Sequence, residues 1–266
     1  MTLFSAGVDV GTMMVKVVVL ADGKDIVGIR MAKTGPDVNT IATGLIAEIL
    51  KERGIDPGTQ LHIVSTGAGR KNITNVIDSK TEFVAFARGA RAADPNAHMV
   101  VDIGGQGLRV MELDDMGVMA NFATNDKCSS GTGCFLDAMA FALRLQESEM
   151  ADLGLKAHKV ANIQATCTIF AESECISLVA KGVPKEEILA GLYGMVAKKI
   201  AGMVTRMGLK QDIVLAGGVS AYPGVVKAVE NELKIKVFVP QNPEAVGALG
   251  AAVIAALVAK KRAGGG

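Results

Sequence analysis

Apolar runs of two kinds alternate along this chain. Short runs bounded by Gly, Asp or Asn predict strands at Phe4–Val10, Val15–Leu20, Ile26–Met31, Leu61–Ser65, Met99–Ile103, Leu108–Leu113, Val118–Ala123, Ile213–Ala216 and Lys236–Val239. Apolar positions three or four apart predict helices at Thr40–Arg53, Thr81–Arg91, Gly133–Leu145, Thr168–Lys181, Pro184–Met207, Val225–Leu233 and Ala245–Ala259. Together these elements predict an α/β protein that opens with a meander of three strands.

One strand pattern occurs twice. Gly7–Gly11 and Val100–Gly105 each form the end of an apolar strand with a single Asp, followed by glycine and another strand. The repeat predicts two lobes, residues 1–95 and 96–266, with the last helix, about 245–260, a candidate to pack back on the first lobe. A mixed α/β protein with tight turns is the alternative, but α/β folds place ligands where these Asp residues lie.

Composition narrows the class of protein. The chain has 266 residues, is half apolar and carries a formal charge of +1, so it can bury a full core but offers no electrostatic case for nucleic acid. No uninterrupted apolar stretch approaches about 18 residues, and the first residues lack the features of a signal peptide. We therefore expect a cytoplasmic protein with no membrane partner, in which the four cysteines stay reduced.

Three glycine-rich turns after predicted strands are candidates for binding nucleotide phosphates. Glycine allows backbone N–H groups to approach phosphate, and the Asp before two of the turns can hold hydrated Mg²⁺. Neither a Walker A sequence nor a G-x-G-x-x-G that opens a helix is present, so P-loop and Rossmann sites are excluded. The candidate nucleotide site comprises Asp9, Gly11, Thr12, Lys16, Asp102, Gly104, Gly105, Gln106, Gly217, Gly218, Val219 and Ser220.

The order of these turns resembles that of the actin-like ATPase superfamily, which includes sugar kinases and Hsp70 chaperones. The resemblance implies a duplicated actin-like, ribonuclease H-like α/β fold whose two lobes close over ATP in a cleft. The first phosphate loop is then 9–16, the second 102–106 and the adenosine loop 217–220. Asp9 and Asp102 become the candidate Mg²⁺ ligands and, with Gln106, the candidate catalytic residues.

Two cysteines, Cys128 and Cys167, lie in polar, hydroxyl-rich turns before predicted helices. The unpaired N–H groups of a helix start favour a thiolate, and a four-iron cluster takes four thiolates. Two per chain therefore indicate a [4Fe–4S] cluster shared across a dimer. The other two cysteines, Cys134 and Cys175, are expected inside helices as small apolar residues. A zinc site made from all four is the rival, but it lacks a C-x₂₋₄-C knuckle.

With both cysteine turns placed, the chain resembles the ATP-dependent activators of 2-hydroxyacyl-CoA dehydratases and the related ATPase subunits of benzoyl-CoA reductase. Four segments carry the resemblance, 102–106, 125–128, 131–137 and 166–174. It implies a dimer that holds one [4Fe–4S] cluster on Cys128 and Cys167 of each subunit. ATP hydrolysis then drives a low-potential electron from ferredoxin or flavodoxin to the catalytic subunits of a dehydratase or reductase, with ADP as the product nucleotide.

The sequence also departs from that family. Met13 and Met14 stand where small hydroxyl residues usually precede the lysine, and Gly107 stands where an acid is common. The alternatives are an ATPase subunit of benzoyl-CoA reductase, which the sparse first loop favours, and an actin-like small-molecule kinase without a cluster. Whether the second subunit is identical or a paralogue stays open, as does the acyl-CoA substrate.

Overall fold

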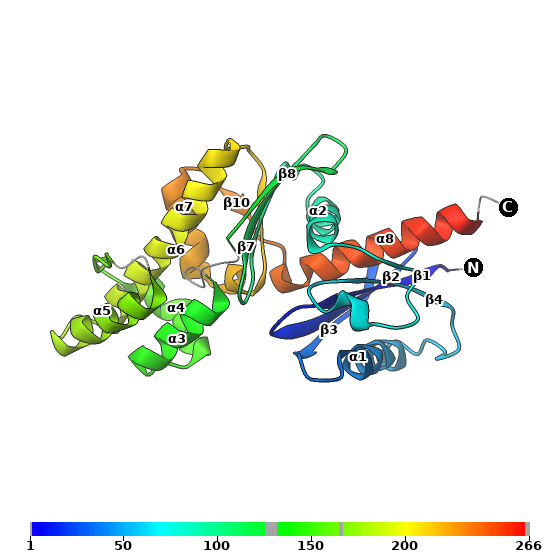
Figure 1. Ribbon diagram of the computed structural model, residues 1–266, viewed down its shortest axis with the longest axis horizontal. Coiled ribbons are helices and arrows are strands. Elements are labelled where there is room, and N and C mark those ends of the chain that lie inside the picture. Colours follow the sequence, from blue (N-terminus) through cyan, green and yellow to red (C-terminus); the bar gives the residue numbers. More distant parts are fainter. Residues whose placement is uncertain (1, 126–131, 165–166, 264–266) are drawn as a thin grey trace. The chain divides into compact units, whose positions relative to one another are not determined.

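The computed structural model describes residues 2–125, 132–164 and 167–263 (Figure 1). The chain divides into two compact units, which we call unit 1 (Met1–Ala97, Leu113–Ala120 and Glu244–Gly266) and unit 2 (His98–Glu112 and Asn121–Pro243). The described residues form two five-stranded sheets, in the orders β3-β2-β1-β4-β5 and β10-β9-β6-β7-β8. The predicted lobe boundary after residue 95 stays a prediction.

The sheet of unit 1 is built around β1. Its strands are β1 (Phe4–Val10), β2 (Met14–Ala21), β3 (Asp25–Lys33), β4 (Leu61–Thr66) and β5 (Asp78–Ser79). The first three form the antiparallel meander predicted from sequence, while β4 pairs parallel to β1. At the β2–β3 turn, Asp22 and Gly23 have φ values of 53° and 79°, which is the backbone conformation that a tight hairpin requires.

Helices cover both faces of this sheet (Figure 1). Helix α1 (Val38–Glu52) packs its apolar side on one face of β1 and β2, and α8 (Val246–Ala263) packs on the other face beside α2 (Glu82–Ala93). Two glycines permit the close approach of α8. A Cβ atom on Gly7 of β1 would lie 1.9 Å from the carbonyl oxygen of Ala248, and one on Gly250 would lie 1.7 Å from that of Ala85.

The second sheet repeats the arrangement of the first. Its strands are β6 (Met99–Ile103), β7 (Leu108–Leu113), β8 (Met119–Thr124), β9 (Ile213–Ala216) and β10 (Val237–Phe238). Strand β6 takes the place of β1, because it pairs antiparallel to β7 and parallel to the later strand β9. The sequence repeat around the two Asp residues therefore corresponds to a repeat of strand pairing.

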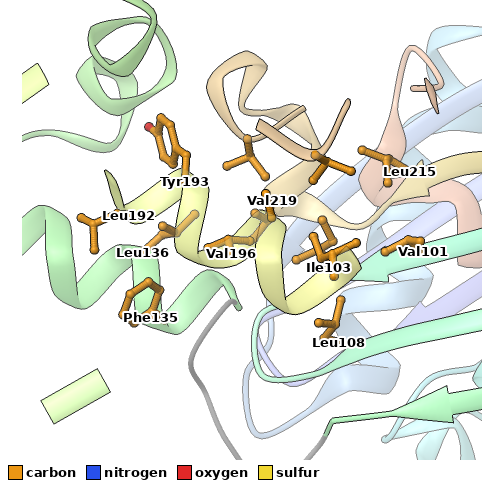
Figure 2. Close-up of a cluster of buried hydrophobic side chains, with 14 of the residues drawn as sticks. Val101, Ile103, Leu108, Phe135, Leu136, Leu192, Tyr193, Val196, Leu215 and Val219 are labelled. Carbon is orange, nitrogen blue, oxygen red and sulfur yellow. The ribbon is translucent and has the colours of Figure 1, made fainter. Parts of the chain in front are cut away.

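The core of unit 2 lies between its sheet and its helices (Figure 2). The helices are α3 (Gly133–Leu143), α4 (Glu147–Leu153), α5 (Thr168–Ala180), α6 (Lys185–Met207) and α7 (Pro223–Leu233), with a short 3₁₀ turn at Gly218–Ala221. Ile103 and Leu108 of the sheet meet Val196 of α6, and Phe135 of α3 is also fully buried. Burying each such side chain contributes roughly 1.5–3 kcal/mol.

Some elements differ from the predictions. Helix α4 and strand β5 were not predicted, and α3 ends at Leu143 because Arg144 adopts a left-handed conformation with φ of 53°. Cys134 lies inside α3, as predicted, but in its first turn, where it is half-buried and not part of the apolar core. Two helices, α6 and the segment 243–263, are long and apolar enough to cross a membrane, but most of the apolar stretch of each is buried.

Candidate functional site

In unit 1, the first predicted phosphate loop begins with an ion pair. Asp9 lies near the end of β1 and Lys16 lies directly opposite it on β2. Lys16 Nζ donates to Asp9 Oδ2 at 3.1 Å. Asp9 is only 2% exposed, so its negative charge needs this partner, whereas the ammonium group stays accessible from the loop.

Unit 2 contains the same pair with a different cation. Asp102 lies near the end of β6, Arg109 lies opposite it on β7, and Arg109 Nη1 donates to Asp102 Oδ2 at 2.8 Å. Asp102 is also 2% exposed, and the side chains of Lys16 and Arg109 are both 17% exposed. Both Asp residues were predicted from the sequence as site residues, whereas Arg109 was not.

The β1–β2 and β6–β7 loops are closed by equivalent backbone hydrogen bonds. The N–H of Gly11 donates to the carbonyl of Met14 at 3.0 Å, and the N–H of Gly104 donates to that of Gly107 at 2.9 Å. Thr12 and Gln106, the predicted polar residues at the loop tips, are both exposed. Gly107, where an acid is common in the resembled family, is thus the counterpart of Met14 in the repeat.

A glycine with positive φ faces each of the two Asp carboxylates. Gly67 follows β4 with φ of 89°, and a Cβ atom on it would lie 2.6 Å from Asp9 Oδ1. Gly217 follows β9 with φ of 86°, and a Cβ atom there would also lie 2.6 Å from Asp102 Oδ1. Each carboxylate therefore contacts a cation through Oδ2 and lies against side-chain-free backbone with Oδ1, so both positions require glycine.

The predicted adenosine loop is a turn held by hydrogen bonds to backbone carbonyls. The Ser220 hydroxyl donates to the carbonyl of Ala216 at 2.7 Å, and the N–H of Gly217 donates to that of Pro243 at 2.8 Å. Val219 is buried in the core of unit 2 and Gly218 is exposed. Only backbone atoms of this turn are thus offered to a ligand at these two positions, which suits recognition by N–H groups.

Of the two cysteines predicted to bind a cluster, the structure describes Cys167. Cys128 lies outside the described residues. Cys167 is the N-cap residue of α5, carries a free thiol and is half-buried. Among the described residues, no group of three or more His, Cys, Asp or Glu could hold a metal ion. A metal ion bound by Cys167 would therefore need ligands other than the described residues of the same chain.

Cys175 has a different environment from Cys167. It is fully buried on α5, and its Sγ lies 3.9 Å from Met139 Sδ of α3. Burial raises the pKa of the Cys175 thiol to about 11, with further contributions from Glu174 and Glu172. A thiol in this state is protonated at neutral pH and is a poor metal ligand. The environment fits the predicted role as a small apolar residue.

The second phosphate loop is tied directly to α3. The N–H of Gly133 donates to the carbonyl of Gly104 at 3.0 Å, and the N–H of Cys134 donates to that of Gly105 at 2.8 Å. A Cβ atom on Gly133 would lie 3.2 Å from Gly105 Cα, so a side chain there would press on the loop. Helix α3 in turn packs against α5, whose first turn Cys167 caps.

The sequence pattern that defines the BadF/BadG/BcrA/BcrD ATPase family matches residues 6–255. The chain belongs to this ATPase family. It is 38% identical over 256 residues to the (R)-2-hydroxyglutaryl-CoA dehydratase activating ATPase of Acidaminococcus fermentans, covering 96% of this chain and 98% of that protein. It is 27% identical over 260 residues to a benzoyl-CoA reductase subunit of Thauera aromatica, covering 94% and 92%.

A solved structure of the ATPase family has the same fold. The activator of 2-hydroxyisocaproyl-CoA dehydratase from Clostridium difficile, with bound ADPNP, aligns with a TM-score of 0.93 at 34% identity and covers 98% of this chain and 97% of that one. The expected duplicated actin-like α/β fold and the expected family are thus confirmed. The roles predicted for individual residues stay predictions.

Proposed function

We propose that this ATPase couples ATP hydrolysis to the delivery of a low-potential electron to a 2-hydroxyacyl-CoA dehydratase. The observation that carries the proposal is the link from a candidate phosphate loop to a cysteine-bearing helix pair. Gly104 and Gly105 are hydrogen-bonded to the start of α3, α3 packs on α5, and Cys167 caps α5. Relatives named as dehydratase activators support the same role.

The groups proposed to bind the nucleotide lie in the loop after β1 in unit 1, and in the loop after β6 and the turn at Gly217–Ser220 in unit 2. Asp9 and Asp102 orient hydrated Mg²⁺, and Lys16 neutralises phosphate charge. Thr12 offers a hydroxyl, and Gly105 and Gly218 offer backbone N–H groups. Gly11 and Gly104 close their loops with their own N–H groups, and their lack of a side chain lets a phosphate approach. Gln106 is exposed at the tip of the second loop, where its amide can orient a water molecule toward the terminal phosphate.

The setting of Cys167 supports an iron–sulfur cluster. Cys167 presents a free thiol at the N-cap of a helix, where unpaired N–H groups favour negative charge. With Cys128, each chain provides two thiolates, so a second copy or a paralogue completes a set of four for one cluster per dimer. A [4Fe–4S] cluster bound there supplies one-electron chemistry at low potential.

The chain's own contribution is to make the start of α3 respond to the nucleotide. A phosphate bound at Gly104 and Gly105 competes with, or reorients, the carbonyls that accept the N–H groups of Gly133 and Cys134. A shift of α3 is passed to α5 because the two helices are packed together. Ferredoxin or flavodoxin is the proposed reductant, and the dehydratase is the proposed acceptor.

Anaerobic purification and reconstitution with iron and sulfide tests the proposal. We expect a brown protein with about four iron atoms per dimer, as one four-iron cluster requires, and loss of the iron in Cys128→Ser and Cys167→Ser. Cys175→Ala is the matched control, because it removes a thiol from the same helix as Cys167 but from a buried position. A colourless reconstituted dimer, or equal iron loss in the control, would contradict the cluster assignment.

An ATPase component of a benzoyl-CoA reductase is the second candidate, supported by the likeness to the Thauera aromatica protein. The two functions differ in the acceptor protein. With ATP and a reduced ferredoxin, an activator restores activity to an isolated 2-hydroxyacyl-CoA dehydratase, whereas a component of a reductase leaves that enzyme inactive. Co-purification with reductase subunits under anaerobic conditions would favour the second candidate.

A further inference from the structure

We propose that Arg109 is a phosphate-binding residue, the counterpart in unit 2 of Lys16 in unit 1. The inference rests on the proposed ATP site and adds a residue that the nucleotide motifs do not contain. Both cations lie seven positions after the Asp that they contact and directly opposite it on the neighbouring strand.

The surrounding loop geometry supports this correspondence. In both loops, the glycine two residues after the Asp closes the turn by donating to a carbonyl three residues later. That glycine also lies beside the cation. A Cβ atom added to Gly11 would lie 3.1 Å from Lys16 Nζ, and one added to Gly104 would lie 3.8 Å from Arg109 Nη1. Each cation is therefore placed at the loop as well as at its Asp.

A purely structural ion pair explains only part of this arrangement. Asp102 is almost fully buried and needs a counter-charge, which a lysine would also supply. The Arg109 side chain is 17% exposed, and Nη1 of its planar guanidinium contacts Asp102. Gly104, Gly105 and Gly107 leave Gln106 as the one side chain of the adjoining loop. A planar, forked cation beside a glycine-rich loop is suited to two oxygens of one phosphate.

The residue composition of the second loop also supports phosphate binding by Arg109. Between Gly104 and Leu108, Gln106 is the one residue with a polar side chain. After Arg109, no other positive charge follows in the sequence until Lys127. From the second loop to residue 126, Arg109 is therefore the one positively charged side chain of the sequence that could add to Lys16 in balancing phosphate charge.

Arg109→Met and Arg109→Lys test the inference in the full-length protein. Lys210→Met is the control, because Lys210 also pairs with an acid on β7, at 3.2 Å from Glu112 Oε1, but lies away from the loop. Binding of ATP is measured by calorimetry and binding of adenosine by ligand-observed NMR, each with thermal unfolding as a check of folding. We expect ATP affinity to fall at least tenfold in Arg109→Met and at least threefold in Arg109→Lys, with adenosine affinity changed less than twofold.

The outcomes separate this inference from the proposed function. If the wild type binds ATP and Arg109→Met binds it equally well, or loses ATP and adenosine affinity in equal measure, the role of Arg109 is structural and the inference is overturned. If Arg109→Met fails to fold, Arg109→Lys decides, and wild-type ATP affinity in that variant overturns the inference. A wild-type protein that does not bind ATP would contradict the proposed function itself.

Discussion

The N–H of Cys134 donates to the carbonyl of Gly105 at 2.8 Å, which joins the first turn of α3 to the second candidate phosphate loop. The neighbouring pair, Gly133 and Gly104, makes the same kind of bond. Two backbone hydrogen bonds in succession hold the loop and helix at a fixed spacing, so neither can move far without the other.

Gly133→Ala should weaken this link. The added methyl would lie 3.2 Å from Gly105 Cα, and the loop must shift by a few tenths of an ångström to admit it. We expect ATP to bind within about threefold of wild type while activation of the dehydratase falls about tenfold or more. Gly194→Ala in α6, with nothing within 4 Å of the new methyl, is the control. Equal activation by wild type and Gly133→Ala would contradict a coupling role.

Gly217→Ala and Gly218→Ala should separate folding from nucleotide binding. At Gly217 a Cβ atom would lie 2.4 Å from the carbonyl oxygen of Ile103, and its φ of 86° is strained for alanine, so we expect a loss of roughly 2–4 kcal/mol in unfolding free energy. Gly218→Ala has open space and should unfold as the wild type does. Chemical denaturation measures the first effect, and ATP calorimetry on Gly218→Ala shows whether this exposed turn contacts the nucleotide.

The Cys175 thiol should make stability depend on alkaline pH. Its pKa is raised from 9.0 to about 11 in the folded protein, so the unfolded state ionises first as the pH rises. The contribution of the protonated thiol to the free energy of unfolding is intact below pH 9. It is lost between pH 9 and 11, by up to about 2 kcal/mol. Denaturation curves across this range should fall more steeply for wild type than for Cys175→Ala. Parallel curves would show that the buried thiol does not titrate in this way.

Gly250→Ala should destabilise unit 1. Its methyl would lie 1.7 Å from the carbonyl oxygen of Ala85 and so force α8 away from α2. Overpacking of this kind costs typically about 1–3 kcal/mol, and here the obstacle is backbone, which cannot rotate aside. Gly44→Ala in α1, where nothing lies within 4 Å, should be neutral or stabilising by about 1 kcal/mol. Thermal unfolding of the two variants gives the comparison.

Much of the fold follows from local sequence. Strand β1, with its lone Asp and following glycine, was predicted with its observed bounds, and so were β6, β7 and β9. Apolar runs this short, bounded by turn residues, favour a strand over a helix because strands are the shorter elements. Helix α4 was missed because it is short and begins with charged residues that leave little apolar periodicity.

The candidate site was harder to predict. Asp9 and Asp102 stand out because a single acid in an apolar strand is unusual, whereas Arg109 looks like an ordinary solvent-facing residue of β7. Its role depends on the cross-strand register that places it opposite Asp102, which the sequence does not specify. Gly67 went unassigned for a similar reason, because its partner Asp9 is 58 positions away in the numbering and meets it only through parallel pairing of β1 and β4.

The packing of α8 on β1 and β4 sets an order of events during synthesis. Helix α8 is synthesised long after β1 and β2, yet it covers a face of the sheet that they form. Until then Val18, Leu20 and Val64 lack their apolar cover. The sheet of unit 1 therefore reaches its final form only after α8 has been synthesised, and until then this apolar face is exposed on the nascent chain.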